Sequence, residues 1–203
     1  MNIHLFRIKQ LVKKMIGRQA TSPKDFLLEA LPKGSVGAEI GTWKGAFADR
    51  MLTIVEPSKL FLIDPYQYIE SYENAWYGKP IGSQSNMDEI YDFVAARFAG
   101  PITKGQVEML RMTSDKALEK FENESLDWVY IDGDHSYEFV KRDLDHFYAK
   151  VKVGGWITGD DYQDGNWWSD GVRRAVNEFV EEKGELLELQ EIKENQFRIK
   201  KIG

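Results

Sequence analysis

Acidic side chains gather at two points of the sequence where apolar runs end. Asp132 and Asp134 follow one run, Asp160 and Asp161 follow the next, and His135 lies three residues after Asp132. If these runs are neighbouring parallel strands, their carboxyl ends line one crevice and the side chains converge. Such a group of carboxylates is unfavourable unless a cation or a proton offsets the charge, and oxygen ligands suit Mg²⁺, Mn²⁺ or Ca²⁺. The alternative is that the four acids only cap helices, which we expect of one of them.

A second chemical feature is the glycine-rich segment 35–45, in which an apolar run carries Glu39 and then turns at Gly41 and Gly45. The spacing differs from the G-x-G-x-x-G of dinucleotide sites, and a carboxylate here would repel a pyrophosphate. Glu39 instead suits a ligand with a positive amino group. The alternative is a glycine turn whose acid has a partner within the protein.

Asp64 ends the next apolar run, 25 residues after Glu39, and Pro65 follows it. An acid at a strand tip, at this distance from a glycine turn, can accept hydrogen bonds from two ribose hydroxyls. The alternative role for Asp64 is an ordinary turn or helix cap.

Composition limits the class of protein. The chain has 203 residues, 27 Lys+Arg against 33 Asp+Glu, and a formal charge of −6. This length predicts one α/β domain, and the negative charge argues against bulk nucleic-acid binding. The absence of cysteine excludes disulfides and thiolate chemistry and is compatible with the cytoplasm, where we expect the protein. No apolar run approaches the ~20 residues of a membrane span.

Apolar periodicity places these motifs in an alternation of strands and helices without internal repeats. The predicted strands are 36–40, 59–64, 107–112, 126–132, 156–162, 186–192 and 197–201, and the predicted helices are 24–30, 46–52, 86–99, 138–150 and 171–183.

Two loops in this alternation are rich in aromatic residues, 66–85 and 163–170. Long aromatic loops in a compact domain are often functional, so we expect a mobile wall of the substrate site. A contact between subunits of a homo-oligomer is the alternative, because exposed Trp and Tyr also mark interfaces.

The N-terminal segment 1–19 carries five basic residues, no acid, and apolar residues at helical spacing. A basic amphipathic helix can lie on an anionic membrane surface. We favour a helix packed on its own domain or on a partner subunit. The predicted organisation is a helical extension, 1–33, before a catalytic core, 34–203.

Three segments, 131–137, 154–162 and 171–179, together resemble a bacterial methyltransferase family related to macrocin-type sugar O-methyltransferases and, more distantly, to catechol-type O-methyltransferases. The glycine turn with Glu39 resembles the first motif of class I S-adenosylmethionine-dependent methyltransferases. The resemblance covers about residues 25–201. It implies an α/β, Rossmann-like class I fold: a seven-stranded, mostly parallel sheet with an antiparallel last strand and helices on both faces.

The resemblance also implies roles for particular residues. Asp132, Asp160 and Asp161 match positions that hold a divalent metal in metal-dependent relatives, and His135 matches a proposed catalytic base. Many relatives have His-Asp-Tyr where this chain has 160–162, a departure that favours an all-carboxylate site. The implied S-adenosylmethionine contacts are Glu39, Gly41, Thr42, Gly45, Asp64, Ser114, Asp115 and Asp132, although Ser114 and Asp115 are equally explained as helix caps.

These observations predict an O-methyltransferase that uses S-adenosylmethionine and Mg²⁺ (or Mn²⁺ or Ca²⁺). The acceptor would be a hydroxyl of a sugar, glycan or small natural product, with no nucleic-acid partner. A metal-dependent hydrolase could use the same acids, but it leaves Glu39 and the glycine turn without a role. A non-catalytic module that binds a cofactor or a glycan is the third alternative.

Overall fold

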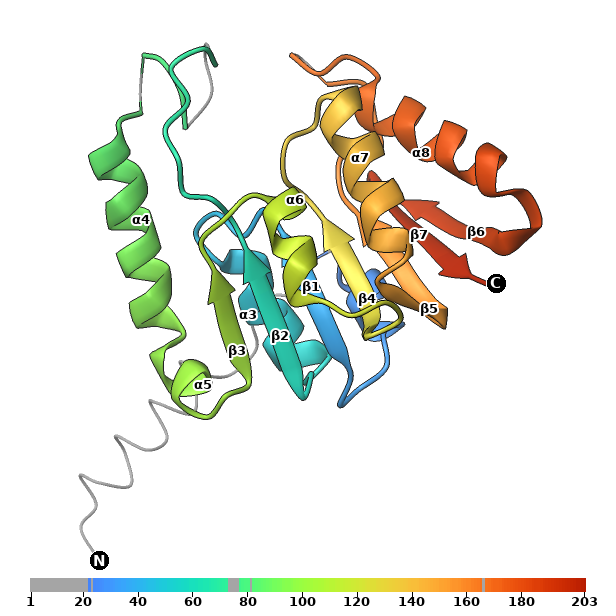
Figure 1. Cartoon of the computed structure of the whole chain (residues 1–203), viewed down its shortest axis with the longest axis horizontal. Coiled ribbons are helices and arrows are strands. Elements are labelled where there is room, and N and C mark those ends of the chain that lie inside the picture. Colours follow the sequence, from blue (N-terminus) through green and yellow to red (C-terminus); the bar gives the residue numbers. More distant parts are fainter. Residues whose placement is uncertain (1–21, 23, 73–76, 81, 166) are drawn as a thin grey trace, which may run out of the picture.

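The computed structural model describes residues 22, 24–72, 77–80, 82–165 and 167–203. Its centre is one open, twisted sheet with the strand order β3-β2-β1-β4-β5-β7-β6 (Figure 1). The first five of these strands are parallel, whereas β7 runs antiparallel to β5 and to β6. The strands are β1 (Val36–Ile40), β2 (Lys59–Ile63), β3 (Val107–Leu110), β4 (Leu126–Ile131), β5 (Val151–Gly159), β6 (Leu187–Lys193) and β7 (Gln196–Lys201). This seven-stranded Rossmann-like architecture confirms the predicted fold class.

Helices cover both faces of the sheet, because right-handed crossovers put their helices on opposite faces when the strand order reverses at β1. One face carries α6 (Ser114–Ala117), α7 (Tyr137–Tyr148) and α8 (Gly171–Lys183), while α3 (Ala46–Ile54) lies behind the sheet in Figure 1. The remaining elements are α2 (Asp25–Glu29), α4 (Gln84–Arg97), α5 (Ala99–Thr103), and the 3₁₀ turns η1 (Leu118–Lys120) and η2 (Gly184–Leu186).

Alternating side chains of the strands divide the core into two apolar layers. In β4, Val129 and Ile131 pack with α7 and α8, whereas Trp128 and Tyr130 pack with α2 and α3. The four side chains are at most 4% exposed. A strand that is buried on both faces reads as a continuous apolar run, which explains why β4 was predictable.

Most element boundaries differ from the prediction by one to three residues, and two elements start earlier than predicted by more than one residue. β5 begins at Val151 instead of residue 156, because Val151 pairs with Leu126 before an irregularity in the ladder. Gly154 and Gly155, which precede the predicted strand, therefore lie within β5, and Gly154 has a positive φ of 80°. α4 begins earlier than predicted, at Gln84, because the Ser83 side chain accepts a hydrogen bond from the Asn86 N–H and caps the helix.

The predicted basic helix at 1–19 lies outside the described residues. The described part of the extension packs on the domain: Leu27 and Leu28 of α2 are fully buried beside Met51 of α3. No helix within the described ranges is long and apolar enough to cross a membrane. The parallel strands all end at the same edge of the sheet, and this edge carries the predicted site residues.

Candidate active site

Glu39 is a buried carboxylate at the end of the central strand β1. Its side chain is 1% exposed, and its Oε2 atom has no hydrogen-bond partner in the described structure. Burial, with the nearby negative charge of Asp132, raises the pKa of Glu39 well above its usual value. An unpartnered buried acid is costly, so this position favours a ligand that brings a cationic hydrogen-bond donor.

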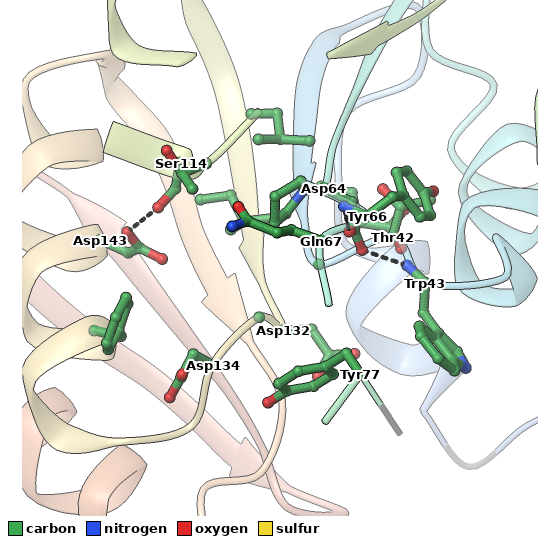
Figure 2. A pocket seen from close by; sticks show the side chains of 18 of the residues that line it. Thr42, Trp43, Asp64, Tyr66, Gln67, Tyr77, Ser114, Asp132, Asp134 and Asp143 are labelled. Atoms are coloured by element: carbon green, nitrogen blue, oxygen red, sulfur yellow. Dashed lines mark hydrogen bonds between the residues drawn. The ribbon is translucent and has the colours of Figure 1, made fainter. Parts of the chain in front are cut away.

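Asp64 follows β2 and faces the glycine turn across the sheet edge. Its Oδ2 accepts a hydrogen bond from the Trp43 backbone N–H at 2.9 Å, drawn as a dashed line in Figure 2, and its Oδ1 accepts one from the Tyr66 N–H at 2.8 Å. Both predicted roles therefore meet at Asp64: it orders the turn, and the remaining lone pairs of its oxygens can accept from a ligand.

The glycine turn brings the ends of β1 and β4 into direct contact. Gly41 has a φ of 88°, and a Cβ atom there would lie 2.0 Å from the carbonyl oxygen of Asp132. A side chain at this position is excluded on both counts. Gly45, with a φ of 72°, precedes the first turn of α3.

His135 lies between two carboxylates at the ends of β4 and β5. Its Nε2 is 3.4 Å from Asp132 Oδ1, and its Nδ1 is 3.4 Å from Asp161 Oδ2. Both are ion-pair contacts whose geometry falls short of a hydrogen bond. Burial lowers the pKa of His135, but the carboxylates outweigh it and the net pKa is raised. Burial and the neighbouring Asp160 and Asp161 raise the pKa of Asp132 to about 6, against the opposing effect of His135.

The same three residues form a candidate cation site. One potential ligand atom from each of Asp132, His135 and Asp161 lies within 4.8 Å of the others. Because bonds from Mg²⁺, Mn²⁺ or Ca²⁺ to oxygen are about 2.0–2.6 Å long, ligand atoms on opposite sides of such an ion are about 4–5 Å apart. The donor set therefore fits a hard divalent cation.

Asp160, the third predicted metal ligand, is not part of this group. Its Oδ2 pairs with the Lys24 ammonium, and its Oδ1 accepts a hydrogen bond from the Asp161 N–H at 2.9 Å. Asp161 itself has a positive φ of 57°, a conformation uncommon for a residue with a side chain. The consecutive acids thus face different partners.

Aromatic residues from the two predicted loops gather beside His135. The Trp167 ring lies nearly parallel to the imidazole at 6.0 Å between centroids, and the Trp168 ring lies edge-on at 4.9 Å. Tyr72 contacts Trp167 at 6.3 Å and donates a hydrogen bond to Asp134. The two loops therefore meet beside His135.

Ser114 and Asp143 form another polar pair in the site. The Ser114 hydroxyl donates to Asp143 Oδ1 at 2.6 Å, and Figure 2 shows this pair across the pocket from Thr42 and Trp43. Burial raises the pKa of Asp143 to about 6. Asp115 is exposed in the first turn of α6.

One cavity of about 520 Å³ unites these groups. The predicted residues that line it are Glu39, Gly41, Thr42, Asp64, Ser114, Asp132 and His135, whereas Gly45, Asp115, Asp160 and Asp161 are not among its lining residues. Sequence reasoning missed Asp143, although an acid on the apolar stripe of α7, beside Val140 and Leu144, was a usable signal. Lys24 gave no signal, because nothing local connects it to Asp160.

Residues 38–162, more than half of the chain, match a family model described as a methyltransferase domain. The chain belongs to this methyltransferase family. Membership supports S-adenosylmethionine as the cofactor, in agreement with the buried Glu39 carboxylate, whose Oε2 has no partner in the described structure. The subfamily of macrocin-type enzymes stays a prediction.

Similar proteins support the fold. A Corynebacterium glutamicum protein is 15% identical with a TM-score of 0.63, covering 100% of this chain and 91% of that one. A candidate methyltransferase from Streptococcus mutans, solved with SAH, is 13% identical with a TM-score of 0.56 and coverages of 89% and 97%. A candidate caffeoyl-CoA O-methyltransferase from Staphylococcus aureus is 11% identical with a TM-score of 0.58 and coverages of 97% and 91%.

A curated relative, uncharacterized protein R132 of Acanthamoeba polyphaga mimivirus, is 47% identical over 55 residues. The match includes 27% of this chain and 24% of that protein, so the chain spans about a quarter of the relative's length.

Proposed function

We propose that this methyltransferase transfers a methyl group from S-adenosylmethionine to a hydroxyl of a small molecule or glycan. The observation that carries the proposal is a single cavity lined both by Glu39 and Asp64 and by Asp132 and His135. One side offers acids to the amino and ribose groups of the cofactor. The other offers a histidine between two carboxylates to an acceptor hydroxyl.

On the cofactor side, Glu39 would accept from the methionine amino group, because its buried Oε2 lacks a partner. Asp64 would accept from the ribose hydroxyls while it holds the turn at Trp43. Bound S-adenosylmethionine supplies an electrophilic methyl group on a sulfonium. Holding both reactants in one cavity can lower the activation free energy by up to about 7–11 kcal/mol.

On the acceptor side, His135 would take the hydroxyl proton, a role that typically contributes about 10²–10⁴-fold in rate. Asp132 and Asp161, each 3.4 Å from the imidazole, would stabilise the imidazolium. The same two carboxylates would hold the divalent cation, whose charge lowers the pKa of a coordinated hydroxyl. The rings of Tyr72, Trp167 and Trp168 suit stacking on a sugar or another flat acceptor face.

The test separates binding from turnover. Calorimetry with S-adenosylhomocysteine should show binding, and methyl transfer to a panel of glycosides and phenolic hydroxyls should stop in EDTA and return with Mg²⁺ or Mn²⁺. Full activity in EDTA, with no metal in the purified protein, contradicts the metal part. Tight S-adenosylhomocysteine binding without transfer to any acceptor favours the non-catalytic module instead.

The Asp161→Ala variant locates the metal part of the site. Asp161 contacts His135 and lies outside the cofactor contacts, so the variant should lose transfer while its S-adenosylhomocysteine affinity stays within about threefold of wild type. A parallel loss of cofactor affinity contradicts this division of roles.

A further inference from the structure

Lys24 places a positive charge of the protein's own at the acidic end of the sheet. Lys24, immediately before α2, pairs through its ammonium with Asp160 Oδ2, although the two residues are 136 positions apart in the sequence. The Asp160 side chain is 10% exposed, and that of Lys24 is 38% exposed. A carboxylate so withdrawn from water needs a counter-charge, and Lys24 provides it.

The position of Lys24 is set by packing rather than by the ion pair alone. Leu27 and Leu28 of α2 are fully buried in the domain core. Asp25, next to Lys24, accepts a hydrogen bond from Arg50 Nε of α3 at 2.7 Å. The chain entering α2 is therefore anchored to α3 and to the core beneath it, which holds the ammonium at Asp160.

This ion pair divides the acids of the edge into two groups. Asp132 and Asp161 face His135, whereas Asp160 faces Lys24. Asp160 nevertheless lies beside this group, because its Oδ1 accepts a hydrogen bond from the Asp161 N–H at 2.9 Å. A divalent cation held by Asp132 and Asp161 would thus meet an adjacent acid that already has a positive partner.

We propose that Lys24 is a positioning residue that keeps Asp160 out of the cation site, so that the Lys24 ammonium at the start of the docked α2 and a divalent cation compete for this carboxylate. The inference rests on the proposed function for the presence of a cation. The affinity of oxygen sites for divalent cations depends on how many carboxylates they offer. Removing the Lys24 charge therefore frees one further ligand and removes a repelling charge at once.

The test measures Mn²⁺ affinity directly, by electron paramagnetic resonance of free Mn²⁺ and by calorimetry, on the full-length protein without acceptor. Lys24→Met should bind Mn²⁺ on the order of tenfold or more tightly than wild type. Lys24→Arg should retain the wild-type affinity, because it keeps the charge. Lys33→Met is the matched control: Lys33 pairs with Glu56 at the other end of the same segment, both side chains are at least 60% exposed, and its loss should change nothing.

Asp160→Asn assigns the effect to this carboxylate. It should leave the wild-type Mn²⁺ affinity within about twofold, but it should remove the gain in the Lys24→Met background. A Lys24→Met protein that binds Mn²⁺ no better than wild type overturns the inference, and so does a gain that survives Asp160→Asn. Mn²⁺ binding by Lys24→Met alone, with none by wild type, supports the inference while it contradicts the metal part of the proposed function. Thermal unfolding of each variant confirms that α2 stays docked.

Discussion

The two sides of the cavity are built in different ways. After their proposed roles, we call Glu39, Gly41 and Asp64 the cofactor half. We call Asp132 and His135, together with Asp161 beside His135 but outside the cavity lining, the acceptor half. The cofactor half is held by backbone groups of adjacent strand ends, such as the Trp43 N–H, which lies 21 residues from Asp64. The acceptor half is enclosed by contacts from distant segments, Lys24 to Asp160 over 136 residues and Tyr72 to Asp134 over 62.

This difference in construction matches the two proposed tasks, recognition of the cofactor and recognition of the acceptor. Recognition of a fixed cofactor needs a rigid turn, which a strand, a glycine and an acid provide locally. Under the proposed function, recognition of an acceptor needs a shaped and partly enclosed space, and the two aromatic loops and Lys24 approach this half from different parts of the chain. Mutations in the cofactor half should therefore affect binding, whereas those in the acceptor half should affect turnover.

The largest effect is expected where the two halves touch. Gly41→Ala should cost about 4 kcal/mol or more in unfolding free energy, because the new Cβ would lie 2.0 Å from the Asp132 carbonyl at a φ of 88°. Gly34→Ala is the control: its φ is 68°, but nothing lies within 4 Å, so only the conformational cost of about 1–2 kcal/mol applies. If urea denaturation shows that the two variants lose the same unfolding free energy, the contact at Gly41 does not have the predicted cost.

The next effect tests the acceptor half alone. His135→Ala should lower turnover by about 10²–10⁴-fold and remove the dependence of the rate on a group titrating near neutral pH. Affinity for S-adenosylhomocysteine should stay within about threefold, and so should that for Mn²⁺ if the carboxylates of Asp132 and Asp161 hold the ion without the imidazole. An unchanged pH–rate profile contradicts the role as base, and a loss of Mn²⁺ affinity makes His135 a metal ligand instead.

The cofactor half is tested by Asp64→Ala. S-adenosylhomocysteine should bind about 100-fold more weakly, because the variant loses the proposed ribose contacts and the partner of the Trp43 N–H at once. Asp49→Ala removes an acid of α3 that pairs with Arg97 outside the cavity, and it should bind normally. Tighter binding of NAD than of S-adenosylhomocysteine by wild type contradicts the assignment of this half.

The smallest effect concerns Asp143, at the border of the cofactor half. Its pKa is about 6 in the folded protein against an ordinary value of 3.8. Because the pKa is higher in the folded state, the folded protein favours the protonated Asp143 and is destabilised when Asp143 ionises. The stability contributed by the protonated carboxyl is fully present below about pH 4 and is lost as the pH rises through 6.

Asp143→Asn should accordingly stabilise the protein by about 2 kcal/mol at pH 7.5 and by little at pH 4. This is somewhat below the roughly 3 kcal/mol that such a pKa shift represents, because Asn weakens the hydrogen bond from Ser114. Asp145→Asn, an exchange on the same helix at a residue that pairs with Lys141, is the control in urea denaturation at both pH values. An equal change at pH 4 and pH 7.5 contradicts the linkage.

By itself, the sequence determined the order of strands and helices and most of the cofactor half. Buried parallel strands must be continuous apolar runs, and a turn that a ligand approaches closely needs glycine. Both features can therefore be recognised from short stretches of sequence. Glu39 and Asp64 were predicted for this reason, and both line the cavity.

Only the tertiary structure decided how the acids of the acceptor half are divided. Asp160 and Asp161 are neighbours in sequence, yet one pairs with Lys24 and the other contacts His135. Charge interactions depend on distance in space, and a residue 136 positions away can be the nearest counter-charge. The partner of Asp160 followed from the packing of α2 on the core, which no local spacing encodes.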